Sequence, residues 1–239
     1  LVGSIGQDAQ GDKMLEGLRT NGVDVSNIKR VTEDGSGQTT IILDDEAENT
    51  IIYVEGANKG LDPDYVTERI QQLDHCKILL AQLETPAETV IAAMKAAKEK
   101  GMKVILDPAP ADQITDEMLV YADVVLPTVH ETEFITGVLV TDEQSAREAA
   151  KFFVSKGIKQ GVLKLGSTGS YVFEDEDLTF IKAIKVNAVD TVGAGDCFAG
   201  ALASALIDGQ PFVEAASYAN IVAALKVTKH GAQAGIPTI

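Results

Sequence analysis

The regular alternation of strand-like and helix-like segments constrains the fold of this chain more than any other feature. Aliphatic and β-branched runs alternate with amphipathic segments of helical length, and no low-complexity linker or internal repeat interrupts them. The buried strand expected over Cys76 to Leu83, the helix from Pro86 to Lys100 and the strand from Lys103 to Leu106 illustrate the pattern. Such a pattern predicts an α/β fold, with a three-layer, doubly wound, mostly parallel sheet that binds ligands at the carboxyl edge of its strands.

One segment departs from this alternation. The β-rich runs Thr39–Leu43 and Thr50–Val54 flank the polar stretch Asp44–Asn49, which predicts a β-hairpin. A hairpin of this kind either extends an edge of the main sheet or forms a small lid that excludes water from a reaction. We predict a lid over residues 37–55, through which the chain forms a homodimer, and one α/β domain made of residues 1–36 and 56–239.

Composition excludes several classes of function. A formal net charge of −16 over 239 residues argues against nucleic acid or an anionic membrane as the main partner. No apolar stretch reaches membrane-spanning length. The two cysteines, Cys76 and Cys197, lie far apart in apolar contexts, so we expect reduced core residues in a cytoplasmic protein.

The most informative short motif runs from Asp190 to Asp196, with the sequence Asp-Thr-Val-Gly-Ala-Gly-Asp. An extended lead-in from Ile184 to Val189 precedes it, and small and apolar residues follow, so we predict a strand, a glycine turn and a helix N-terminus. Glycines let the backbone approach a ligand, and the first turn of a helix binds anions. A carboxylate beside such an anion site suits phosphoryl transfer to a hydroxyl, although many glycine turns before helices only cap and pack.

The complete string resembles the C-terminal signature of the ribokinase-like (PfkB) carbohydrate kinases. This resemblance implies that Asp196 is the base that deprotonates the sugar hydroxyl and also contacts the sugar. It further implies that the turn holds the transferring phosphate of MgATP through the amides of Gly193, Ala194 and Gly195.

Three further segments match the family in order along the chain. Glu84 stands in a Leu-Glu-Thr-Pro segment, where the resemblance implies contact with ribose and the alternative is a charge that complements a helix dipole. Asp107 opens an Asp-Pro-Ala-Pro segment like the one that lines the phosphate and metal region, although it could be a stiff loop only. Gly56-Ala57-Asn58 also fits the ribokinase pattern.

The segment that begins at Pro127 resembles the family's Pro-Asn-x-x-Glu, whose Asn and Glu organise Mg²⁺ and the nucleotide phosphates. Glu131 fits the Glu position, which implies a role at Mg²⁺. Thr128 replaces the asparagine and keeps a hydroxyl but loses an amide donor. The neighbouring His130 is expected at the surface or in a cap.

Two segments resemble the nucleotide-binding parts of the family. The first is the glycine turn after a strand, where an ordinary hairpin turn is the alternative; it comprises Lys164, Leu165, Gly166, Ser167, Thr168 and Gly169. The second is Asn220 on the last helix, at the adenine-side position. With Thr128, Gly195 and Asp196, these residues are the expected ATP contacts.

The resemblance also implies a monovalent cation, K⁺, in a loop near the end of the chain. The corresponding positions are Asp190 and the carbonyls around Val192, Lys226, Lys229, Gly231 and Gly235. Residue type does not report on carbonyl ligands, so this expectation rests on the resemblance alone.

The resemblance leads to one preferred function and several alternatives. We expect an ATP-dependent kinase for the terminal hydroxyl of a pentose, with D-ribose preferred. Fructose, deoxyribose or a nucleoside are alternative substrates of the same fold, and a non-catalytic nucleotide-binding fragment is a rival of another class. The family's first strand and its Gly-Gly-x-x-x-Asn segment, which grip the sugar, are not found in this sequence, so we expect a piece of a longer protein.

Overall fold

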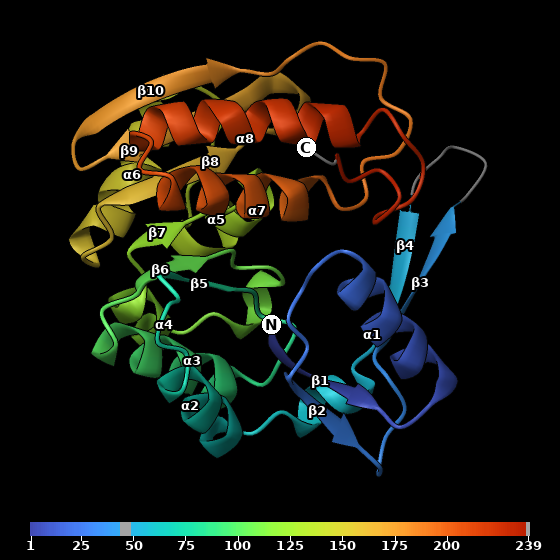
Figure 1. Cartoon of the computed structure of the whole chain (residues 1–239). Helices are drawn as coiled ribbons and strands as arrows, with labels where there is room; N and C mark the ends of the chain where they lie inside the picture. Colours follow the sequence, from blue (N-terminus) through green and yellow to red (C-terminus); the bar gives the residue numbers. More distant parts are fainter. Residues whose placement is uncertain (44–48, 238–239) are drawn as a thin grey trace. The chain divides into compact units, whose positions relative to one another are not determined.

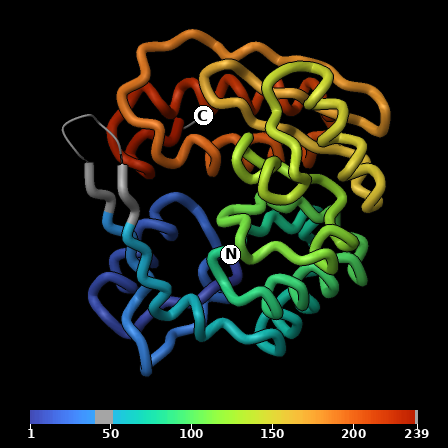
Figure 2. The backbone as a smooth tube through the Cα atoms, turned by 180° about the vertical axis from the view of Figure 1, so that it is seen from behind, coloured from blue at the N-terminus to red at the C-terminus, as the bar shows by residue number. Residues whose placement is uncertain are grey.

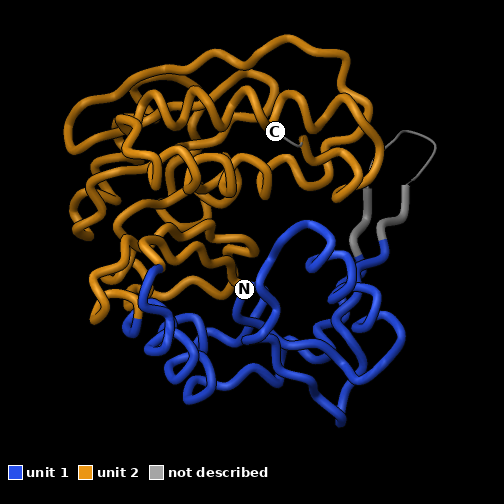
Figure 3. The backbone as a smooth tube through the Cα atoms, viewed as in Figure 1, with its two compact units in different colours: residues 1–75, 84–96 blue, residues 76–83, 97–239 orange. Residues whose placement is uncertain are grey.

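The structure, a computed structural model, describes residues 1–43 and 49–237. The chain divides into two compact units, shown in different colours in Figure 3. Unit 1 comprises residues 1–75 and 84–96, and unit 2 comprises residues 76–83 and 97–239. Figures 1 and 2 show the elements from opposite sides.

Unit 2 is built on a sheet of six strands in the order β10-β9-β8-β7-β6-β5. Four neighbouring strands are parallel: β5 (Ile78–Ala81), β6 (Lys103–Leu106), β7 (Val124–Val125) and β8 (Gln160–Lys164). The last two are antiparallel, β9 (Gly169–Glu174) and β10 (Asp177–Lys182). The predicted mostly parallel α/β sheet is therefore confirmed.

Helices cover both faces of this sheet, because strand side chains alternate between the two faces. One face packs on α7 (Ala194–Ile207) and α8 (Phe212–Lys226), in a core that includes Val172 and Leu202. The next residue along β9, Phe173, points to the other face and stacks on Phe153 of α6 (Glu143–Ser155), with ring centroids 6.1 Å apart. Each such buried apolar side chain contributes about 1.5–3 kcal/mol. The shorter helices α4 (Asp116–Tyr121) and α5 (Val129–Thr136) complete the unit.

The same alternation directs two charged residues toward the first turn of α7. Ile105 of β6 and Val162 of β8 belong to the core beneath α7 and α8. Asp107 and Lys164 lie two positions further along, so they face the same side at the carboxyl ends of the strands. Parallel sheets bind ligands at this edge.

Unit 1 contains a two-stranded parallel sheet of β1 (Val2–Gly6) and β2 (Asn27–Val31). Its helices are α1 (Ala9–Thr20), α2 (Pro63–Gln71) and most of α3 (Ala87–Glu99), whose residues from 97 onward belong to unit 2. Asp8 caps α1 by accepting the Gly11 amide at 2.7 Å, and its other oxygen accepts the Ser36 amide at 2.7 Å. These hydrogen bonds lower the pKa of Asp8.

The predicted hairpin is a separate antiparallel sheet of β3 (Gln38–Leu43) and β4 (Asn49–Val54), paired from Gln38 with Val54. Of the turn expected over residues 44–49, residues 44–48 lie outside the described residues, and Asn49 belongs to β4. Ile52 and Val54 of β4 are half exposed. The hairpin is confirmed, and its role as a lid remains a prediction.

Three expectations about local structure were wrong. The lead-in over residues 184–189 is not a strand: it follows the end of β10 and has no ladder partner, and its backbone joins the loop after α8, where the Val189 amide donates to the Val227 carbonyl at 2.7 Å. The strand predicted over 76–83 forms, but only as the shorter β5, and its residues are not buried as expected. Cys76 is exposed, because it precedes β5 beside His75 and Lys77, whereas Cys197 is buried as expected.

Candidate active site

The glycine motif forms the start of α7, as expected. At the N-termini of α1, α2, α4, α5 and α6, a side chain accepts a hydrogen bond from a backbone amide. The N-cap of α7 is Gly193, so no side chain caps this helix. Because the first amides of a helix lack partners within the helix, this N-terminus is suited to an anion. Asp196, in that first turn, is exposed.

The two glycines of the motif serve different purposes. Gly193 has a φ of 81°, and a Cβ there would lie 3.2 Å from the Ala232 carbonyl oxygen, so both conformation and packing require glycine. For a Cβ at Gly195, the nearest described atom outside the local chain is Lys164 Nζ at 3.8 Å, an ordinary contact. Packing therefore tolerates a side chain at Gly195, which leaves the approach of a ligand as a reason for glycine.

Asp107 and Lys164 form a buried ion pair at this edge of the sheet. Lys164 Nζ donates to Asp107 Oδ1 at 2.9 Å and to Oδ2 at 3.1 Å, and the side chains are 14% and 3% exposed. Burial raises the pKa of Asp107, Lys164 opposes the rise, and the charges of Glu131 and Asp196 add to it. The Asp107–Lys164 pair therefore lies near enough to Glu131 and Asp196 for their charges to act on it.

Thr128 and Glu131 cap α5 reciprocally. The Thr128 amide donates to Glu131 Oε2 at 2.7 Å, and the Glu131 amide donates to the Thr128 hydroxyl at 3.3 Å. Thr128 also bridges to Lys164 in parallel fashion. One carboxylate oxygen of Glu131 is therefore engaged by the protein, so any role at Mg²⁺ would use the other oxygen.

The expected nucleotide loop lies between β8 and β9. Gly166, Ser167 and Thr168 form an exposed 3₁₀ turn. A Cβ at Gly169 would clash with the Ile181 carbonyl, so this glycine is required by the approach of β10. Asn220 Nδ2 donates to the Lys182 carbonyl at 3.0 Å, which ties α8 to the end of β10.

The residues expected to hold K⁺ lie together, around Asp190. Its Oδ1 accepts the Val192 amide at 2.9 Å and its Oδ2 accepts the Gly231 amide at 2.7 Å, and these two bonds lower its pKa. The fully buried Lys226 donates from Nζ to the Asp190 carbonyl at 3.0 Å. The resemblance implies a role for the Lys226 carbonyl alone, whereas the structure also brings its side chain to Asp190.

Glu84, the expected sugar contact, belongs to unit 1 and is exposed. Its carbonyl accepts the Tyr53 hydroxyl at 3.0 Å, and Asn58 Nδ2 donates to the same hydroxyl at 3.1 Å. Burial raises the pKa of Tyr53, and the charges of Glu84 and Glu55 act in the same direction. Unit 1 therefore groups three polar residues on which a polyol could make hydrogen bonds.

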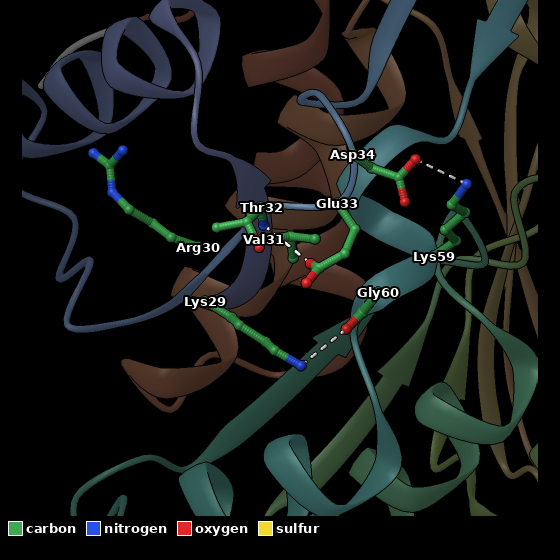
Figure 4. A pocket seen from close by; sticks show the side chains of 8 residues that line it. All are labelled: Lys29, Arg30, Val31, Thr32, Glu33, Asp34, Lys59 and Gly60. Carbon is green, nitrogen blue, oxygen red and sulfur yellow. Dashed lines mark hydrogen bonds and ion pairs between the residues drawn. The ribbon is translucent and has the colours of Figure 1, made fainter.

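The cavity in Figure 4, of about 680 Å³, lies within unit 1 and is not lined by any of the predicted site residues. Its cations are already paired, Lys59 with Asp34 at 3.0 Å and Lys29 with Asp62 at 2.6 Å.

Within residues 1–43 and 49–237, no cluster of three acidic, His or Cys side chains could hold a metal ion. In the same ranges, no helix combines the length and the apolar character that a membrane span needs.

Comparison with known proteins defines the class. The model of the pfkB family carbohydrate kinases matches residues 1–239. A ribokinase of Haemophilus influenzae is 39% identical over 237 residues, which cover 99% of this chain and 78% of that protein. A deoxyribokinase of Salmonella typhi is 31% identical over 242 residues, which cover 100% and 78%. The solved structure of Arabidopsis thaliana ribokinase complexed with ribose and ATP superposes with a TM-score of 0.90 at 32% identity, covering 99% and 78%.

The chain therefore belongs to the pfkB family of carbohydrate kinases, phosphotransferases that act on an alcohol group. Its function is that of an ATP-dependent sugar kinase of the ribokinase type.

Proposed function

We propose that this kinase transfers the γ-phosphoryl group of ATP to O5 of D-ribose, with Asp196 as the base. The observation that carries the assignment is the placement of Asp196 in the first turn of α7, a helix without a side-chain cap, beside the Asp107–Lys164 pair. An anion site with an adjoining carboxylate provides the two functions that phosphoryl transfer to a hydroxyl needs.

The reaction balances with these residues. The Asp196 carboxylate takes the proton of the sugar hydroxyl, the bond from O5 to the γ-phosphorus forms, and the bond to the β-γ bridging oxygen breaks to release ADP. The amides of Gly193, Ala194 and Gly195 hold the oxygens of the phosphoryl group in flight. A positioned general base contributes about 10²–10⁴ in rate.

The nucleotide is held by residues of unit 2. Lys164 provides a positive charge next to Gly195, and the exposed turn of Gly166, Ser167 and Thr168 allows the backbone to approach ATP. The Leu165 amide donates to the Gly169 carbonyl at 2.9 Å, which closes this turn. Thr128 and Asn220 support the same surface by the contacts described above. Their assignment to ATP rests on the resemblance to the family's motifs.

Mg²⁺ fits this site as an ion carried by the nucleotide. Mg²⁺ commonly binds through one or two carboxylates together with substrate phosphates and water, so a cage of three protein carboxylates is not needed. Glu131 is the carboxylate available for it, through the oxygen that the α5 cap does not use. When bound, Mg²⁺ neutralises charge on the phosphates.

K⁺ does not fit the residues expected to bind it, because the Lys226 ammonium lies among those ligands.

The sugar is recognised in part by Glu84, with Tyr53 and Asn58 beside it. The similarity to a deoxyribokinase makes 2-deoxyribose the second candidate substrate.

The hairpin of β3 and β4 presents the exposed apolar residues Ile52 and Val54, which suits a lid that also forms a homodimer contact. Reduced thiols at Cys76 and Cys197 and the need for ATP favour a cytoplasmic enzyme.

A coupled assay of ADP release over D-ribose, 2-deoxyribose, fructose and a nucleoside tests the proposal, with the product identified by ³¹P and ¹³C NMR. We expect the highest kcat/KM for D-ribose and phosphorylation at O5. A higher kcat/KM for another sugar, or phosphate on another oxygen, would refute the substrate assignment. Lys151→Ala, an exposed change on α6, is the control for nonspecific loss of activity.

A further inference from the structure

Lys226, the last residue of α8, has a side chain that is 0% exposed. Lysine is almost never fully buried unless its charge is paired. Its ammonium donates to the main-chain carbonyl of Asp190 at 3.0 Å and lies 4.0 Å from the carboxylate oxygen Oδ1 of the same residue. This cation is therefore held by a backbone oxygen and a carboxylate, which are the kinds of ligand that a bound alkali ion takes.

The course of the side chain places it inside the loop that follows α8. A Cβ at Gly235 would lie 3.0 Å from Lys226 Cε and 3.2 Å from the Gly231 carbonyl oxygen, so the lysine passes directly along Gly235. The Gly231 amide donates to Asp190 Oδ2 at 2.7 Å. Of the positions expected to surround K⁺, Asp190 therefore contacts the ammonium of Lys226, Gly235 lies along its side chain, and Gly231 binds the same aspartate.

An alkali ion and this ammonium do not fit together. Both are monovalent cations of similar size, and they would repel each other beside Asp190, the carboxylate that the described residues place next to the ammonium. Deep burial also costs any unpaired charge heavily. The residues present therefore do not suit K⁺ while Lys226 is in place.

We propose that the Lys226 ammonium is a built-in monovalent cation, which occupies the loop in place of K⁺ and makes the kinase independent of it. Lys226 acts as a positioning residue: it holds the Asp190 carbonyl three residues before Gly193, and Gly193 in turn packs against Ala232 of the loop. Its charge also reaches the start of α7. Burial and Asp196 raise the pKa of Cys197, and Lys226 opposes them.

Two substitutions separate this role from simple packing. Lys226→Ala removes the ammonium and leaves a space lined by the Asp190 carboxylate and backbone carbonyls, into which K⁺ or Rb⁺ can enter. Lys226→Met removes the charge but keeps the space filled with apolar atoms, so no ion can enter. Lys151→Ala, exposed on α6, is the matched control for the loss of one lysine.

Ion binding is the direct test, and it does not require activity. In crystals soaked with RbCl, we expect no anomalous peak at the loop of the wild-type protein and a clear peak beside Asp190 in Lys226→Ala. The melting temperature should rise with KCl, relative to choline chloride at equal ionic strength, in Lys226→Ala only. An Rb⁺ peak in the wild-type loop would overturn the proposal, and so would a wild-type melting temperature that depends on K⁺. These wild-type measurements decide the question even if Lys226→Ala fails to fold.

The effect on turnover rests on the proposed function. With K⁺ replaced by choline, the wild-type rate should stay within about twofold, whereas Lys226→Ala should lose about tenfold or more and regain most of it in KCl, because a displaced anion site costs rate steeply. Lys226→Met should stay slow in both salts. A wild-type enzyme stimulated several-fold by K⁺ would contradict the proposal. If no sugar were phosphorylated, the proposed function would fail while the Rb⁺ and melting results still decided the role of Lys226.

Discussion

Two lysine–aspartate pairs of unit 2 differ in their exposure and in the atoms that the lysines bind, which fits the proposed division between a ligand-binding lysine and a supporting one. Lys164 makes two hydrogen bonds to the Asp107 side chain and keeps 14% of its own side chain exposed. Lys226 has no exposed surface, and its hydrogen bond goes to the backbone of Asp190. A lysine at the surface of a site can turn from its partner to a phosphate, whereas an enclosed lysine that binds a carbonyl holds the chain in place.

The pKa values of the two aspartates are shifted in opposite directions. Burial raises the pKa of Asp107, and Lys164 is the partner that opposes this. Two backbone amides, from Val192 and Gly231, lower the pKa of Asp190, so its charge depends less on Lys226. The charge of Asp107 therefore depends on Lys164, a side chain of the candidate site. The charge of Asp190 is stabilised mainly by backbone amides of its own loop and of the loop after α8.

The largest expected effect comes from Asp196, whose charge acts on the Asp107 pair. Asp196→Asn should lower kcat by about 10³-fold, because the base is lost, and should leave ATP affinity nearly unchanged. Steady-state kinetics and ATP titration measure both quantities. Near-normal turnover would remove Asp196 from the role of base.

The next effect sharpens the contrast between the lysines. Lys164→Met leaves Asp107 buried without its partner, which should cost about 3–5 kcal/mol of folding free energy and lower kcat/KM by about 10²-fold. Asp107→Asn in the same protein should restore most of the stability, since the unpaired charge is gone, but not the rate. Chemical denaturation and kinetics compare the variants. Recovery of both quantities together would mean that Lys164 acts only in folding.

The two glycines of the motif give smaller, opposite results. Gly193→Ala should cost about 1–3 kcal/mol, because φ is 81° and the Ala232 carbonyl lies close to the new Cβ. Gly195→Ala should leave the melting temperature nearly unchanged and reduce the rate, because the methyl group would meet the phosphoryl group. A large loss of stability in Gly195→Ala, with Gly193→Ala unaffected, would contradict this account.

The smallest effect is a difference in pH dependence between the aspartates. The raised pKa of Asp107 means that the folded state binds the proton more tightly than the unfolded state does, so this residue's contribution to stability falls as pH rises from its ordinary pKa of 3.8 through the raised one. The lowered pKa of Asp190 gives stability that is present above 3.8 and lost as pH falls through the lower value. Asp107→Asn should remove the first trend and Asp190→Asn the second, as measured by urea midpoints against pH.

Much of the fold could be predicted from the sequence, because local pattern determines it. The bounds of β6 agree with the residues predicted for it, α7 begins at the predicted glycine turn, and the hairpin strands pair as expected. The prediction failed at residues 184–189 and at Cys76, where strand formation and burial depend on neighbours far away in the sequence. β-branched residues such as Val186 favour a strand but do not provide a partner for it.

For the site, the sequence predicted which residues take part but not the contacts that their side chains make. The glycine motif and the loop around Gly231 meet as the resemblance implies, since the Gly231 amide binds Asp190. The Asp107–Lys164 pair was not foreseen, because it depends on β6 and β8 presenting those residues to the same face across β7. The buried ammonium of Lys226 was not predicted, because the resemblance implies only backbone carbonyls as cation ligands in this loop.

The most direct test of the account is the dissociation constant of ATP for Lys164→Ala and Lys226→Ala, each measured by calorimetry in KCl and in choline chloride. We predict that Lys164→Ala binds ATP about tenfold or more weakly in both salts, because a charged contact is lost. Lys226→Ala should bind weakly in choline chloride and return to within about twofold of the wild type in KCl. Equal behaviour of the two variants, or recovery of Lys164→Ala alone, would contradict the division between a ligand-binding lysine and a built-in cation.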